Sequence, residues 1–86
     1  MKALLKTTRQ NKGLKIRELA HLMGVDQAIV SKIESGVRQA TKEQVIKLSA
    51  ILEIPEETLI PLWIKERLLN ELKYEPYAAQ AINMVQ

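Results

Sequence analysis

The chain has 86 residues and no cysteine, which fits one small domain, or one domain with an appendage, and excludes a disulfide framework or a thiolate metal site. Apolar residues make up 47% of it and aromatic residues 3%, a composition that favours helices packed on helices over a β-sandwich. The net charge of +3 divides into +6 over residues 1–50 (ten Lys and Arg, four Asp and Glu) and −3 over residues 51–86 (three and six), which indicates either a polyanionic partner for the first half or an uneven surface.

Glycines and capping residues delimit the first four predicted helices, which cover residues 2–11, 15–23, 27–35 and 42–52. Gly13, Gly24 and Gly36 follow the first three helices, and Asp26 is a suitable N-cap for the third. Thr41 opens the fourth helix with a capping box. Apolar spacing predicts a core that includes Leu4, Leu5, Thr8, Ile16, Leu19, Ala20, Met23, Val30, Ile33, Val45, Ile46, Leu48, Ser49 and Leu52.

Prolines divide the second part of the chain. Pro55 suits the first turn of a short fifth helix, and Pro61 marks a kink or a restart before a longer helix over residues 62–73. Pro76 begins a last helix, and its apolar pattern stops at Gln86 without a capping signal, as in a helix that continues further. The whole chain is predicted to be all-α.

A helix-turn-helix is predicted between residues 15 and 34. Ala20 is small where two helices cross closely, and Gly24, four residues later, permits the positive φ of a sharp turn. Val30 follows at the tenth position after Ala20, so the spacing is that of a DNA-binding helix-turn-helix. A plain helical hairpin within a bundle is the alternative.

The outward face of the predicted helix 27–35 is suited to reading bases, since it carries Gln27, Ala28, Ser31 and Lys32 and no acid. A carboxamide at the helix start can pair with adenine, a lysine can reach guanine, and small apolar groups can contact the thymine methyl. Lys15, Arg17, Arg38 and Lys42 flank this helix and suit phosphate contacts, or they are ordinary surface charges.

Residues 9–54, which begin RQNKGLKIRELA and include GVDQAIVSKIESGVR, resemble the DNA-binding domain of the Cro/C1-type (XRE) family of transcriptional regulators. The resemblance covers roughly residues 1–60. It implies a five-helix lambda-repressor-like DNA-binding domain over 1–60, followed by a C-terminal helical extension over 61–86.

The resemblance also assigns roles to residues of this chain. It implies a structural ion pair between Arg9 and Glu34, and it supports the base-reading and phosphate assignments while adding Ser35 to the phosphate contacts. The chain departs from the family at Ile16, where a phosphate-clamping Gln is common. We expect that contact to be lost or replaced by Lys15 or Arg17.

The extension contains more apolar residues than a five-helix core requires, and we expect Trp63, Ile64, Leu68 and Leu72 to form a dimer interface. The alternative is that the tail folds back over the monomer's own core. The resemblance implies two-fold dimers on palindromic sites.

The predicted function is therefore a sequence-specific double-stranded DNA-binding transcriptional regulator. It is expected to bind palindromic operators as a homodimer, with helix 27–35 in the major groove, and to act as a repressor or autoregulator. The alternative is a protein-binding module, or an antitoxin-like partner protein, that uses the apolar C-terminal helix.

A single histidine, His21, and the absence of a plausible catalytic set argue against an enzyme. We expect no cofactor, metal or small-molecule ligand. No apolar run suits a signal peptide or a membrane span, so a cytoplasmic location without a membrane partner is expected.

Overall fold

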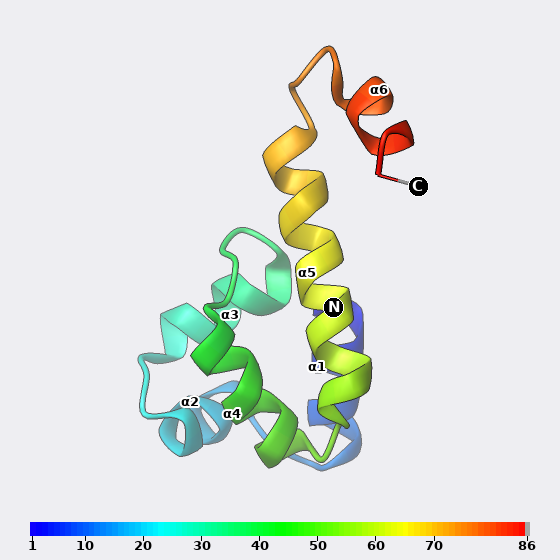
Figure 1. Ribbon diagram of the computed structural model, residues 1–86. Coiled ribbons are helices and arrows are strands. Elements are labelled where there is room, and N and C mark those ends of the chain that lie inside the picture. The colour runs from blue at the N-terminus through cyan, green and yellow to red at the C-terminus, as the bar shows by residue number, and fades with distance from the viewer. Residues whose placement is uncertain (86) are drawn as a thin grey trace.

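The computed structural model describes residues 1–85 and is all-helical over that range. The helices are α1 (Lys2–Asn11), α2 (Ile16–Met23), α3 (Gln27–Ser35), α4 (Lys42–Leu52), α5 (Glu56–Leu72) and α6 (Ala78–Asn83). The first four helices and the start of α5 form a compact body, and the rest of α5 projects beyond it (Figure 1). The helix α6 turns back beside the projecting end. Gln86, where the predicted last helix stops, lies outside the described residues.

The core of the compact body is aliphatic, as the scarcity of aromatic residues predicts. Buried side chains come from each of the helices α1 to α5, and the largest of those with almost no exposure are Leu5, Leu19, Met23, Leu48, Leu52, Leu59 and Val45. Ile46 was expected in this core, but it is 41% exposed because it lies on the outer side of α4. Burial of these aliphatic side chains is the main force that holds the helices together.

Local capping accounts for the helix boundaries. The capping box at α4 is present: the Thr41 hydroxyl accepts from the Gln44 backbone N–H at 3.2 Å, and the Gln44 side chain accepts from the Thr41 backbone N–H at 3.0 Å. Asp26 occupies the N-cap position of α3, but its side chain makes no capping hydrogen bond. The predicted N-cap position is therefore confirmed, although the Asp26 carboxylate does not contribute a hydrogen bond to it.

The two helices expected on either side of Pro61 are one continuous helix, α5. Pro61 lies one turn inside this helix, where its missing N–H leaves only the carbonyl of Glu57 without its helical donor. Both residues are exposed, so water can satisfy that carbonyl and the helix need not end. The boundary expected between residues 60 and 61 thus falls within a single helix. No helix among residues 1–85 is long and apolar enough to cross a membrane.

Candidate nucleic-acid interface

The helices α2 and α3 form the predicted helix-turn-helix. Ala20 is almost fully buried at their crossing, and Gly24 ends α2 in the left-handed conformation with φ of 72°. The Val25 backbone N–H donates to the Ala20 carbonyl at 3.0 Å, which closes the turn. Val30 and Ile33 are buried beneath α3 and fix its inner side. The outer side of α3 is therefore presented to solvent in a defined orientation.

The residues expected to read bases lie together on that outer side. Gln27, Ala28, Ser31 and Lys32 are all exposed, and Gln27 is the first residue of α3. The acid within α3, Glu34, is turned toward α1 and is not part of this face. The face therefore offers one carboxamide, one hydroxyl, one methyl group and one cation, without a carboxylate to repel DNA.

The residues expected to contact phosphate lie on the segments that precede and follow the helix-turn-helix and on the first turn of α2. Lys15 is the N-cap residue of α2 and Arg17 lies in its first turn, whereas Arg38 follows α3 and Lys42 opens α4. All four cations are exposed, and within residues 1–85 none of them has an ion-pair partner. Free cations next to helix N-termini form a favourable environment for anions.

Ser35, which the family resemblance adds to the phosphate contacts, lies at the end of α3. Its side chain is exposed, and the hydroxyl donates to the carbonyl of Lys32 at 3.1 Å. Ile16, where the family often has Gln, is half-buried and packs against the core. An aliphatic side chain in that position supports the helix packing but has no group to offer a phosphate.

The ion pair between Arg9 and Glu34 is present and nearly buried. The Arg9 Nε donates to Glu34 Oε2 at 2.6 Å and the Nη2 donates to Oε1 at 3.1 Å, so the contact is bidentate. The remaining guanidinium donor, Nη1, reaches the Leu14 carbonyl at 2.7 Å. This network ties the end of α3 to α1 and to the segment before α2, so it holds the whole helix-turn-helix in place.

Trp63 does not lie where a dimer contact was expected. Its indole is 6% exposed, and its Nε1 donates to the Ala40 carbonyl at 2.7 Å in the loop between α3 and α4. The expectation for this residue is wrong, because α5 begins before Pro61 and carries Trp63 back onto the monomer's own core. At Trp63 the structure instead agrees with the alternative, in which the C-terminal segment folds back over the monomer's own core.

The other three residues expected at a dimer interface lie farther along α5. Ile64 and Leu68 are 46% and 57% exposed, and Leu72 is half-buried. Leu68 and Leu72 line a groove between α5 and α6, which has a volume of about 470 Å³ and was not expected from the sequence. Its lining is apolar except for one lysine: Lys65, Leu68, Leu69, Leu72, Ala81, Ile82 and Val85. The helical spacing of leucines in α5 could have predicted one wall of this groove, but the sequence does not show that α6 lies opposite them.

The described part of the chain contains no cluster of side chains that suits metal binding. No group of three or more His, Cys, Asp or Glu side chains among residues 1–85 could hold a metal ion. His21 is exposed on α2. Among residues 1–85, the one carboxyl with a clearly displaced pKa is Glu53, whose pKa is lowered by a hydrogen bond from Lys12 Nζ at 2.9 Å and by the charge of that lysine. This pair joins α1 to the end of α4, away from the face described above.

Comparison with known proteins identifies relatives over the same part of the chain. A family model described as "Helix-turn-helix" matches residues 5–59. RghRB of Bacillus subtilis (strain 168), described as an uncharacterized HTH-type transcriptional regulator, is 39% identical over 57 residues. The match covers 65% of this chain and 41% of that relative, so the chain spans less than half of the relative's length. No solved structure gives a significant match.

Proposed function

Since the chain belongs to the Cro/C1-type (XRE) helix-turn-helix family, we propose that it is a sequence-specific double-stranded DNA-binding transcriptional regulator. The observation that carries this proposal is the acid-free exposed face of α3, together with the exposed cations of the neighbouring segments, which have no ion-pair partner among residues 1–85. The regulator of Bacillus subtilis to which the chain is similar supports the same role. The proposed mode of control is repression or autoregulation.

In the proposed complex, α3 enters the major groove. Gln27 at its N-terminus pairs with an adenine, Lys32 reaches a guanine, and Ala28 and Ser31 contact the bases between them. Lys15, Arg17, Ser35, Arg38 and Lys42 contact phosphates and set the register of the protein on the duplex. The Arg9–Glu34 pair acts as scaffold.

We further propose that the protein binds palindromic operators as a homodimer. Leu68 and Leu72 line the apolar groove between α5 and α6, and Ile64 is exposed four residues before Leu68 on α5. The helix α6 has no buried residue and only six residues, too few for a stable isolated helix. A second copy that covers this groove would stabilise α6 and pair two recognition helices at a spacing of about one helical turn, roughly 34–36 Å.

Selection of bound duplexes from a random pool tests the proposed DNA recognition, because an inverted repeat is expected among the selected sequences. On the selected site, Gln27→Ala should cost about 1–3 kcal/mol and relax the preference at one base pair. Arg38→Ala should weaken binding to all sequences about equally and reduce the salt dependence. If both variants behave alike on selected and random DNA, the assignment of the reading face is wrong.

Sedimentation velocity tests the dimer. The wild type should sediment as a dimer at micromolar concentration and Leu68→Glu as a monomer, because burying a charged carboxylate in an apolar interface is costly. Leu22→Glu is a matched control, since Leu22 on α2 is exposed to a similar extent (55% against 57%) but lies away from the groove. A monomeric wild type, or equal effects of the two variants, would contradict the proposed interface.

The apolar groove also supports a second candidate function, in which the chain is a protein-binding module or an antitoxin-like partner that holds another protein between α5 and α6. DNA-binding experiments at increasing salt separate the two functions. A regulator loses duplex affinity steeply with salt concentration because it displaces counterions from phosphates, whereas a flat response without a preferred sequence favours the protein-binding module.

A further inference from the structure

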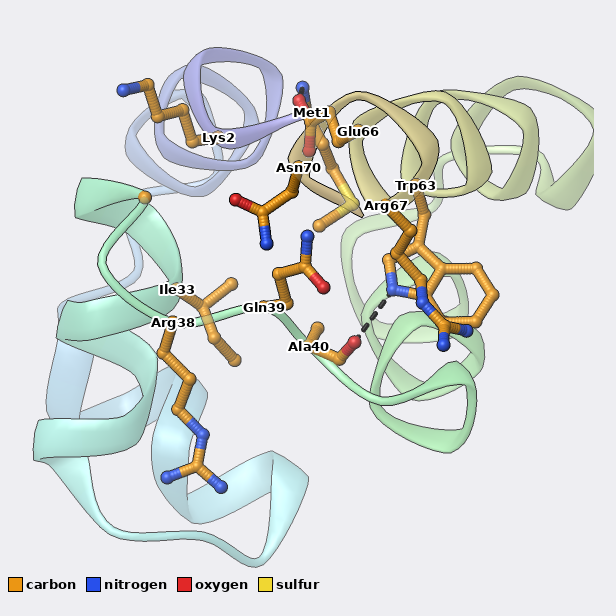
Figure 2. Close-up of a pocket in the computed structure, with 11 residues that line it drawn as sticks. Met1, Lys2, Ile33, Arg38, Gln39, Ala40, Trp63, Glu66, Arg67 and Asn70 are labelled. Atoms are coloured by element: carbon orange, nitrogen blue, oxygen red, sulfur yellow. Dashed lines mark hydrogen bonds and ion pairs between the residues drawn. The ribbon is translucent and has the colours of Figure 1, made fainter. Parts of the chain in front are cut away.

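A second hollow, away from the apolar groove, lies where three parts of the chain meet. It has a volume of about 260 Å³ and lies between the start of α1, the loop between α3 and α4, and the middle of α5 (Figure 2). Ile33, Ala40 and Trp63 supply apolar surface to its wall. Because these residues belong to the core, that part of the hollow is preformed.

Two carboxamide groups face the middle of this hollow. The side chains of Gln39 and Asn70 point toward one another from the α3–α4 loop and from α5 (Figure 2). Both side chains are exposed, and neither makes a hydrogen bond to another group among residues 1–85. The NH₂ group of a carboxamide is a donor that suits an oxygen of a bound molecule.

The charge around the hollow is positive. Lys2 and Arg38 belong to the lining, although their charged ends point away from the two carboxamides, and the guanidinium of Arg67 lies over the Trp63 ring at 4.8 Å from its centroid (Figure 2). Glu66, the one acid in the lining, pairs with the amino group of Met1, which neutralises it. Lys2, Arg38 and Arg67 have no such partner within the described chain.

We propose that this hollow binds a small metabolite that carries a carboxylate or phosphate group. The free carboxamides would donate to the oxyanion, the three cations would balance its charge, and the apolar wall would contact its carbon atoms. The volume is below the roughly 300 Å³ at which typical ligand pockets begin, so the ligand is small. Arg38 is shared with the proposed phosphate contacts, so bound oxyanion competes with the DNA backbone and weakens duplex binding. This competition rests on the proposed function, whereas binding to the hollow does not.

The fluorescence of Trp63 reports binding directly, since this is the chain's one tryptophan and its side chain lines the hollow. The full chain is titrated, without DNA and at constant ionic strength, with sodium phosphate, citrate or adenosine monophosphate, and with uncharged adenosine as the control. A saturable change with at least one of the anions and none with adenosine is expected, and the three anions distinguish phosphate from carboxylate. No saturable change up to roughly 10 mM of any anion would overturn the proposal.

Matched variants distinguish anion binding in the hollow from non-specific attraction of anions to positive charges elsewhere on the surface. Lys2→Gln should weaken binding by about tenfold, the loss of one charge-assisted contact, whereas Lys6→Gln, which removes the same charge from α1 outside the hollow, should change it less than about twofold. A second pair of variants leaves the charge unchanged. Asn70→Leu should weaken anion binding more than its control, Asn83→Leu on α6, does. Equal weakening within either pair would overturn the site.

Competition is then measured on a labelled duplex obtained from the random-pool selection. The anion that binds should weaken duplex binding by the wild type more than chloride does at equal ionic strength, and Asn70→Leu should abolish this difference. An unchanged duplex affinity would overturn the competition. Failure to bind any duplex would instead overturn the proposed function, and the tryptophan titration would still decide whether the hollow binds an oxyanion.

Discussion

Replacing Arg9 with methionine should strongly destabilise the helix-turn-helix, because it leaves the Glu34 carboxylate nearly buried without its partner. The side chains of Arg9 and Glu34 are only 9% and 6% exposed. The guanidinium makes two hydrogen bonds to the carboxylate and one to the Leu14 carbonyl, so the substitution removes three contacts. Methionine fills a similar volume, and the expected loss is therefore mainly electrostatic.

Removing one partner of a buried ion pair costs about 3–5 kcal/mol of unfolding free energy. A domain of this size has a total stability of about 5–15 kcal/mol, so Arg9→Met removes a large part of it. With a shift of about 4–8 °C per kcal/mol, the lower figure corresponds to a fall in Tm of roughly 12–24 °C. The helix content at low temperature should be retained, because the aliphatic core is unchanged.

The assay is thermal and urea unfolding followed by circular dichroism on Arg9→Met, Glu34→Leu and the double variant. The double variant should be much more stable than the sum of the single losses predicts, since neither charge is then left unpaired. Arg9→Lys, which keeps the charge but loses the bidentate geometry, covers the case in which Arg9→Met does not fold. The exposed pair Lys12–Glu53 is the control, where little or no coupling is expected. Additive losses at Arg9 and Glu34 would refute the reasoning.

Three further predictions concern α5 and the end of α4. Trp63→Phe should cost about 1–3 kcal/mol in urea unfolding, because a buried backbone carbonyl loses its donor; an unchanged midpoint would contradict this. Pro61→Ala should raise stability by about 1 kcal/mol in the same assay, since it restores a hydrogen bond to the Glu57 carbonyl. Lys12→Met should raise the pKa of Glu53 toward its ordinary value, measured by NMR titration, because the lysine holds it low. The small stability that this pair gives is present above the ordinary glutamate pKa and is lost as the pH falls through the lowered one.

Local signals in the sequence were sufficient to predict the helix-turn-helix. The ranges 27–35 and 42–52 agree with α3 and α4, because Gly36 and the Thr41 capping box are short-range signals that tertiary packing reinforces. The Arg9–Glu34 pair joins residues 25 positions apart, and composition or spacing could not have placed them in contact. It was expected from the family resemblance alone, and the structure contains it.

The errors in the sequence-based expectations arise where packing overrides a local signal. Pro61 was interpreted as a kink or a restart, but no new helix starts there, because Pro61 lies one turn inside α5 on an exposed side, where the loss of one hydrogen bond is tolerated. That helix then carries Trp63 into the core, although the residue appeared to belong to a separate apolar tail. The sequence did not predict the hollow that Gln39 and Asn70 line, because nothing in it shows that the fold places these two carboxamides face to face (Figure 2).

The continuity of α5 bears on how the proposed dimer would hold its two recognition helices. Trp63 anchors this helix to the Ala40 carbonyl, in the loop that directly follows α3. From there to Leu72 the helix rises about 1.5 Å per residue without interruption. The apolar stripe formed by Ile64, Leu68 and Leu72 is therefore rigidly connected to the recognition helix α3. Pairing two copies through Leu68 would thus fix the distance between their α3 helices, rather than merely raise their local concentration. Inserting two alanines after Arg67 would rotate the stripe by about 200° and is expected to abolish operator binding while leaving binding to random DNA unchanged. Retained operator binding by this variant would show that dimer geometry is not set through α5.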